Sequence, residues 1–267
     1  MSMMNANAAA TTAMTANEPL DFVLPEMGDA DFSSEELAED RDGFTMSFPR
    51  IKIPAGGGLA YEVPGDDPNS PDSAKDFSAV ILYHHPINSY YKEKFTGGNN
   101  PPDCSSLDGK LGVVAETGEC KECKTCPYAK FGSGENGGMA CKQKRRMYLL
   151  REGEMLPIIM TLPTGSLAEF TKYVTRLVTR GMKANHVVTK FSLKRAQNST
   201  GINYSQVICS VDRPLSPEEK KNIASMTEQV KLIAGKVSVA ETERNKDKAA
   251  VSAYSRSSRL HDLRCRL

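Results

Sequence analysis

Five of the seven cysteines in this chain of 267 residues fall within one short segment: Cys104, Cys120, Cys123, Cys126 and Cys141. The C-x2-C spacing of Cys123 and Cys126, followed directly by Pro127, is typical of a tight turn that places two thiolates on one tetrahedral ion. The odd cysteine count and a first segment unlike a secretion signal argue against a framework of disulfides. The spacing therefore predicts a closed four-thiolate zinc site that contributes folding energy rather than catalysis.

Two choices stay open within this cluster. Cys104 and Cys141, at the ends of a Gly-rich stretch, would complete the set, but Cys120 also forms a C-x2-C pair with Cys123 and is a candidate substitute ligand. Cys120, Cys123 and Cys126 together resemble the start of a ferredoxin run, in which proline follows the fourth cysteine. Here Pro127 follows the third, so zinc is favoured over an iron–sulfur cluster.

Basic and aromatic residues alternate in several further segments. Single-stranded nucleic acid is held by cations that track phosphates and by aromatic faces that stack bases, at about 1–3 kcal/mol per base. The alternative is that Tyr91, Phe95 and Tyr148 are core residues and that the lysines form a solvated face. Taking the set together, we expect nucleic-acid contacts from Tyr90, Tyr91, Lys92, Lys94, Phe95, Lys144, Arg145, Arg146, Tyr148, Lys190, Lys194, Arg195 and Tyr204.

The net charge of +1 hides a strong asymmetry along the chain. Between Met1 and Pro49, ten acidic residues stand against a single base, Arg41, so this segment carries −9 and residues 50–267 carry +10. An acidic arm joined to a basic body is typical of proteins that meet polyanions. The alternative is that the acidic segment is only a solubilising tail on an ordinary domain.

The elements that must position these residues follow from hydrophobic patterning. Residues 1–46 lack sustained periodicity and cannot bury enough apolar surface to offset the entropy of ordering, which predicts a mostly disordered acidic arm. Within it, 21–24 is a short docking candidate. Capping boxes predict helices that begin at Ser166 and at Ser216, the second running to about Ala234. Alternating or β-branched runs predict strands at 50–54, 59–63, 77–84, 146–151, 155–162, 186–196 and 202–211, the last four forming two hairpins.

These elements predict a mainly β, α+β fold: an OB-like antiparallel barrel with an inserted zinc-ribbon-like module and one or two helices. The nucleic-acid-binding domain spans 47–212, with the zinc insertion at about 97–145. Few large apolar residues lie in that insertion, so it needs a bound metal ion to stabilise its fold. Residues 213–267 form a C-terminal helix and a polar basic tail.

Support for catalysis or membrane insertion is weak. His84-His85 could act as a metal pair or a base, but no carboxylate follows at a fixed spacing, so structural histidines are favoured. Gly56-Gly57-Gly58 lacks the Lys-Ser/Thr of a phosphate loop. No apolar run approaches the roughly 18–20 residues of a membrane span. We therefore expect a non-enzymatic, cytoplasmic protein.

Several motifs together resemble a family of single-stranded DNA-binding proteins encoded by bacteriophages and integrative mobile elements. The resemblance covers about residues 48–212 and rests on RIKIP and GGG at 50–58, HHP at 84–86, PPDCSSLDG at 101–109, CKTCP at 123–127, FGSG at 131–134, ACK at 140–142, and Leu162-Pro163 with Ser166. The chain is also similar in plan to the T-even phage helix-destabilising protein, which is an OB barrel with a zinc-binding insertion beside the DNA groove.

The resemblance implies Cys104, Cys123, Cys126 and Cys141 as zinc ligands and leaves Cys120 as an extra cysteine. It implies a role in DNA replication or recombination inside a bacterial host cell. The chain departs from the family because the acidic arm is N-terminal, where it would recruit replication or recombination proteins. Two other functions stay open: a zinc-ribbon adaptor that binds a host protein such as RNA polymerase, and a metal-dependent nuclease using His84 and His85.

Deleting residues 1–46 should tighten binding to a single-stranded oligonucleotide at low salt, because the arm carries −9 and competes for the basic body. Fluorescence anisotropy with labelled oligo-dT measures the change, and the difference should vanish at high salt. Equal affinities for the full and shortened chains would make the arm a tail without this role.

Overall fold

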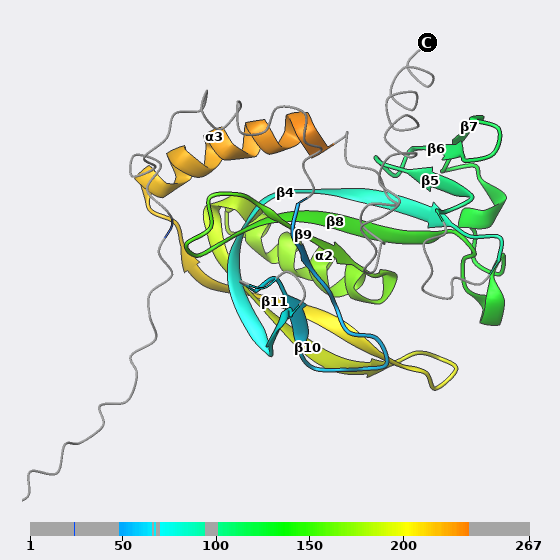
Figure 1. Cartoon of the computed structure of the whole chain (residues 1–267), viewed down its shortest axis with the longest axis horizontal. Helices are drawn as coiled ribbons and strands as arrows, with labels where there is room; N and C mark the ends of the chain where they lie inside the picture. The colour runs from blue at the N-terminus through cyan, green and yellow to red at the C-terminus, as the bar shows by residue number, and fades with distance from the viewer. Residues whose placement is uncertain (1–23, 25–47, 66, 68–69, 94–100, 235–267) are drawn as a thin grey trace, which may run out of the picture.

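The computed structural model describes residues 24, 48–65, 67, 70–93 and 101–234. The fold is mainly β with two α-helices, as the α+β prediction requires (Figure 1). Apart from Leu24, the predicted arm at 1–46 lies outside the described residues, as do Lys94, Phe95 and the tail beyond 234. The strands are β1 (Arg50–Ile51), β2 (Tyr61–Val63), β3 (Asp72–Ala74), β4 (Asp76–Tyr90), β5 (Cys104–Ser106), β6 (Leu111–Val114), β7 (Cys120–Glu122), β8 (Lys142–Arg151), β9 (Ile158–Leu162), β10 (Val187–Gln197) and β11 (Asn203–Pro214).

The long strand β4 is the centre of the main sheet. It pairs along most of its length with β8, its first five residues pair with β10, and its last three residues pair with β5. The order β1-β9-β8-β4-β5-β6-β7 runs across the sheet, with β10 and β11 branching from β4, while β2 and β3 form a separate pair. All pairings in the main sheet are antiparallel except β1 with β9.

Both predicted hairpins are confirmed as β8–β9 and β10–β11. The prediction that a strand ends at His84 is wrong, because β4 continues to Tyr90 through Pro86. Proline is tolerated there because Pro86 has a paired strand, β8, on one side only. On the other side of β4, the pairing with β10 ends at Val80 and the pairing with β5 begins at Asn88.

The main sheet is open between β11 and β1. In the described residues, β11 pairs with β10 alone.

A β-bulge interrupts the ladder between β4 and β8. Ile81 lies opposite Leu149 and Tyr83 lies opposite Tyr148, so Leu82 is an extra residue on β4. A bulge of this kind breaks the alternation of faces along a strand. Leu82 and Tyr83 consequently both pack on the same side of the sheet, against the core cluster that contains Tyr148.

Two helices cover opposite faces of the β4–β8 ladder (Figure 1). Helix α2 (Thr164–Thr179) packs Phe170, Tyr173 and Leu177 into the core that contains Met147 and Leu149 of β8. Helix α3 (Pro217–Ala234) packs against the alternate β8 residues, Tyr148 and Leu150. The sheet is therefore buried on both faces, which explains the continuous apolar runs of its central strands. Leu24, within the predicted docking segment 21–24, packs against the α3 side of this core.

The start of α2 corrects the predicted capping box. The helix begins at Thr164 after Pro163, and Ser166 is fully buried rather than an N-cap. The Ser166 hydroxyl accepts a hydrogen bond from the backbone N–H of Val207 at 2.9 Å and so joins α2 to β11. Phe170 and Leu177 are buried on one face of the helix, and Leu167 and Val174 pack against the same core.

The start of α3 confirms its predicted capping box. The Ser216 N–H donates to the Glu219 carboxylate at 2.7 Å, and the Glu219 N–H donates to the Ser216 hydroxyl at 3.2 Å. Arg213 donates from Nη2 to Glu219 Oε1 at 2.7 Å. This hydrogen bond is the main reason that the Glu219 pKa falls from 4.5 to about 2.

Replacing Glu219 by glutamine should lower the free energy of unfolding by about 1 kcal/mol at neutral pH, because the cap and the Arg213 pair are both weakened. The folded-state pKa is depressed, so the carboxylate stabilises the fold above pH 4.5 and loses this effect as the pH falls towards 2. Urea unfolding of E219Q and of wild type, at neutral pH and near pH 2, measures the difference in the free energy of unfolding. Glu228→Gln is the matched control, since that exposed carboxylate pairs only with Lys231 on the helix surface.

Candidate functional site

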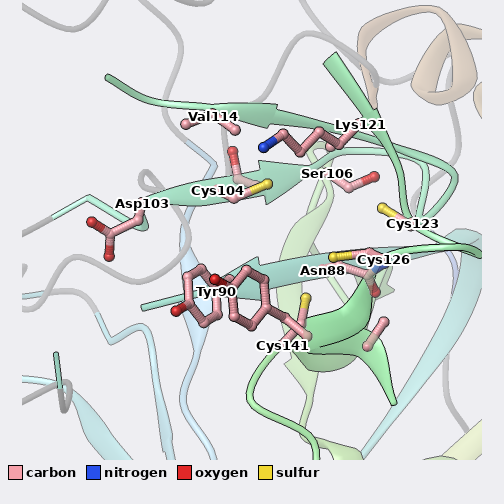
Figure 2. Close-up of a pocket in the computed structure, with 14 residues that line it drawn as sticks. Asn88, Tyr90, Asp103, Cys104, Ser106, Val114, Lys121, Cys123, Cys126 and Cys141 are labelled. Atoms are coloured by element: carbon pink, nitrogen blue, oxygen red, sulfur yellow. The ribbon is translucent and has the colours of Figure 1, made fainter. Parts of the chain in front are cut away.

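Four of the clustered cysteines come together at the far end of the β4–β8 ladder. Cys104 begins β5 opposite Tyr90, and Cys123 follows β7 with its N–H donating to the Lys110 carbonyl at 2.7 Å. Cys126 precedes the short 3-10 helix at Pro127–Ala129, and Cys141 directly precedes β8. Figure 2 shows the four sulfurs turned toward one hollow, with Tyr90 at its edge.

The sulfurs are close enough to affect one another. A Cβ on Gly112 would lie 3.0 Å from the Cys104 sulfur and 3.6 Å from the Cys123 sulfur, so this strand position has no room for a side chain. Burial and then the neighbouring thiols raise the pKa of Cys104 to about 11 and that of Cys141 to about 12. Without a cation these two thiols stay protonated at neutral pH.

Cys120 stands apart from this arrangement. It lies in β7 opposite Val113, and it is not among the residues that line the hollow, whereas Cys104, Cys123, Cys126 and Cys141 are. In the described part of the chain, no three His, Cys, Asp or Glu side chains already have a geometry that could hold a metal ion. Binding would therefore require the four thiol side chains to close further around an ion.

A second hollow adjoins the cysteine hollow and shares Tyr90 and Tyr128 with it. Its volume is about 520 Å³. The Tyr90 and Tyr128 rings stack at 4.3 Å between centroids, with 17° between their planes, and Tyr128 is 46% exposed. The predicted contacts Tyr91, Lys92 and Lys144 line the same hollow, together with Lys142. Aromatic rings and ammonium groups thus meet in one place.

Each ring of this stacked pair is positioned by the cysteine segment. Tyr90 pairs across the sheet with Cys104. The Tyr128 carbonyl, two residues after Cys126, accepts hydrogen bonds from the Cys141 N–H at 2.8 Å and the Ser133 hydroxyl at 3.0 Å. Tyr128 and Lys142 were not among the predicted nucleic-acid contacts, although an aromatic residue two positions after the C-x2-C pair could have indicated Tyr128.

Two of the predicted nucleic-acid contacts are corrected by burial. Arg146 and Tyr148 are both 0% exposed. Tyr148 packs edge-on against Phe48 at 5.8 Å and donates from its hydroxyl to the Ala234 carbonyl at 3.3 Å. Both residues lie on the face of β8 covered by α3, because side chains two apart on a strand share a face. They are core residues, out of reach of a strand of nucleic acid.

Arg145 lies on β8, and four further predicted contacts on the β10–β11 hairpin do not line the two hollows above: Lys190, Lys194, Arg195 and Tyr204. Lys190 pairs with Asp76 at 3.4 Å, and Lys194 is exposed. Arg195 donates from Nε to the Gly57 carbonyl at 3.1 Å. The Tyr204 ring covers Gly165 so closely that a Cβ there would lie 2.6 Å from it, so Tyr204 holds the start of α2.

His84 and His85 do not form a metal pair. The His84 ring packs edge-on against Phe170 at 5.1 Å on the α2 side, whereas His85 stacks on Tyr148 at 6.0 Å on the α3 side. Their rings therefore point to opposite faces of the sheet. Burial, followed by neighbouring arginines, lowers the pKa of both histidines to about 4, so both are neutral near pH 7.

No protein-family model, curated protein or solved structure matches this chain. Within the described residues, no helix is both long and apolar enough to span a membrane.

The reduced protein should bind about one zinc ion per chain, and Cys126→Ser or Cys141→Ser should weaken binding strongly, because a closed site needs four ligands. Metal analysis after dialysis measures this. Removing the metal should also change the near-ultraviolet circular dichroism of the stacked Tyr90–Tyr128 pair. Cys209→Ala is the matched control, since that buried β11 thiol does not line the cysteine hollow. Full zinc retention in both serine variants would contradict the assigned ligand set.

Proposed function

We propose that this protein binds single-stranded DNA without strong sequence preference, through the hollow that contains the stacked tyrosines. The observation that carries the proposal is the Tyr90–Tyr128 pair, whose Tyr128 ring is exposed in a hollow also lined by Lys92, Lys142 and Lys144. A duplex hides the faces of its bases, whereas a single strand presents them to such a pair.

The order of the elements supports an OB-like barrel for the body. A meander of β4, β8 and β9 is followed by α2 and by the β10–β11 hairpin, with β10 returning to pair with β4. This is the strand succession of an OB barrel, in which the loop between strands one and two and the loop between strands four and five bind oligonucleotides. The first of these loops corresponds to the cysteine segment, and the second is the turn between β10 and β11.

We also propose that Cys104, Cys123, Cys126 and Cys141 hold one structural zinc ion. The segment from β5 to the 3-10 helix at Pro127–Ala129 buries few apolar side chains: in its three strands and that helix, only Ser106 and Gly112 are buried. A segment of this kind gains its folding energy from a metal. Zinc would draw the thiols together as thiolates and fix the turn that carries Tyr128.

Mechanistically, lysine ammonium groups displace counterions from phosphates while tyrosine rings stack bases. Affinity therefore falls steeply with salt and depends little on sequence. In keeping with the family resemblance of residues 48–212, we propose a role in phage or mobile-element DNA replication or recombination within the bacterial cytoplasm. The N-terminal acidic arm would then contact replication or recombination proteins.

Replacing Tyr128 by leucine should weaken oligo-dT binding about 5- to 100-fold, since one stacked base contributes about 1–3 kcal/mol. Lys142→Gln should weaken binding less and reduce the salt dependence, because one phosphate contact is lost. Fluorescence anisotropy from about 50 to 500 mM salt measures both changes. Lys231→Gln on α3 is the charge-matched control. Unchanged affinity in Y128L, with zinc content and stability intact, would reject this hollow as the binding site.

The adaptor alternative has one observation in its favour. Phe131, in the cysteine segment, is 82% exposed and is suited to insertion into a protein pocket. Capture of one host protein that persists after nuclease treatment, and that is lost in Phe131→Ser, would favour the adaptor. The nuclease alternative relied on His84 and His85, whose rings lie on opposite faces; a cleavage assay with magnesium or manganese tests it.

A further inference from the structure

A third hollow, of about 250 Å³, lies where β4, β8 and α2 meet. Lys144 lines both this hollow and the tyrosine hollow, so the two are neighbours along β8. The lining is polar on the strand side and includes the amide of Gln143 and the guanidinium of Arg145. The full lining is Pro86, Asn88, Gly109, Gln143, Lys144, Arg145, Leu167 and Thr171.

Arg145 is held in place by two neutral groups. Its Nη1 lies 2.7 Å from His84 Nδ1, and its guanidinium carbon lies 5.9 Å from the centre of the Phe170 ring. Because the guanidinium can only donate, the neutral His84 ring accepts through Nδ1. The Phe170 ring packs edge-on against the same histidine at 5.1 Å. Histidine and phenylalanine therefore fix the orientation of the Arg145 fork.

Within the described residues, no carboxylate forms an ion pair with Arg145. Arg145 is half-buried, and among the described residues its polar side-chain contact is with the neutral His84. The ion pairs formed by other arginines, such as Arg213 with Glu219, have no counterpart here. Burying a cation without a counter-charge is unfavourable, and burial accordingly lowers the pKa of Arg145. Such a charge is best satisfied by an anion that enters the hollow.

We infer that this hollow is a phosphate subsite in which Arg145 binds one phosphodiester of the DNA strand. This inference rests on the proposed function and adds a path for the strand. A base stacks in the tyrosine hollow, Lys144 lies between the hollows, and the next phosphate meets the oriented Arg145 fork. A planar guanidinium can bind two phosphate oxygens at once, which a lysine ammonium cannot reproduce.

The test compares Arg145→Lys and Arg145→Gln with the control Arg180→Gln, an exposed arginine at the end of α2. R145K should weaken oligo-dT binding about 10-fold although the charge is kept, because the fork geometry is lost. R145Q should lower the salt slope by about 0.7. R180Q should change neither quantity. Wild-type affinity in R145K would show that Arg145 acts only as a diffuse charge and would overturn the subsite.

A second arm uses oligo-dT in which one linkage at a time is a neutral methylphosphonate. At the position that meets Arg145, the neutral linkage should weaken wild-type binding about as much as R145Q does, and R145Q should lose nothing further there. Equal losses in wild type and R145Q at every position would overturn the inference. Phosphorus NMR with inorganic phosphate tests whether the hollow binds free phosphate instead of a phosphodiester of DNA. Phosphate binding that depends on Arg145, combined with full oligonucleotide affinity in R145Q, would make the hollow a site for free phosphate and overturn the inference. A wild type that binds phosphate at Arg145 but no oligonucleotide would instead reject the proposed function.

Discussion

β4 and β8 run antiparallel from Ala79 opposite Arg151 to Ser89 opposite Lys142, and both the core and the candidate site are built on this ladder. One end is enclosed between α2 and α3, where Leu149 and Tyr148 point to opposite sides. The other end carries the cysteine segment (Figure 1). The tyrosine hollow and the Arg145 hollow lie at this same end. Burial at one end thus supplies the rigidity that the sparsely packed end lacks.

The distribution of charge has a structural counterpart in the body. Lys190 and Arg213 are paired with carboxylates, whereas Arg145 is supported by a neutral histidine and a phenyl ring. A neutral support orients a cation without cancelling its charge. The near-zero net charge of the whole chain therefore says little about the field at this end of β8.

Local signals in the sequence were sufficient where the structure depends on local contacts. Both hairpins followed from alternation and turn residues, and the α3 start followed from the spacing of Ser216 and Glu219. Spacing also identified Cys123 and Cys126, since a C-x2-C turn brings its thiols together through the chain itself. Spacing left Cys120 open as a substitute ligand, and the family resemblance implied Cys104 and Cys141 instead.

Non-local packing accounts for the predictions that were wrong. Ser166 looked like an N-cap, but a strand 41 residues later supplies its partner. Lys144 and Arg146 belong to the same basic run, yet only Arg146 is fully buried, on the face of β8 that α3 covers, and no local pattern encodes the position of that helix. The stacking of Tyr128 on Tyr90 likewise depends on a contact between segments 38 residues apart, which spacing alone does not reveal.

The bulge at Leu82 makes the position of a length change in β4 matter in a way that composition would not show. Beyond this bulge, His84 faces Phe170 and His85 faces Tyr148. Removing Leu82 alone would leave Tyr83 opposite Tyr148 and keep both faces. Removing one residue between His85 and Tyr90 would instead turn over every later side chain of the strand, so that Tyr90 would leave Tyr128. A change in length is tolerable in the turn at 198–201, where no ladder of paired strands fixes the register, but in the regular part of β4 the number of residues itself encodes which side chains meet.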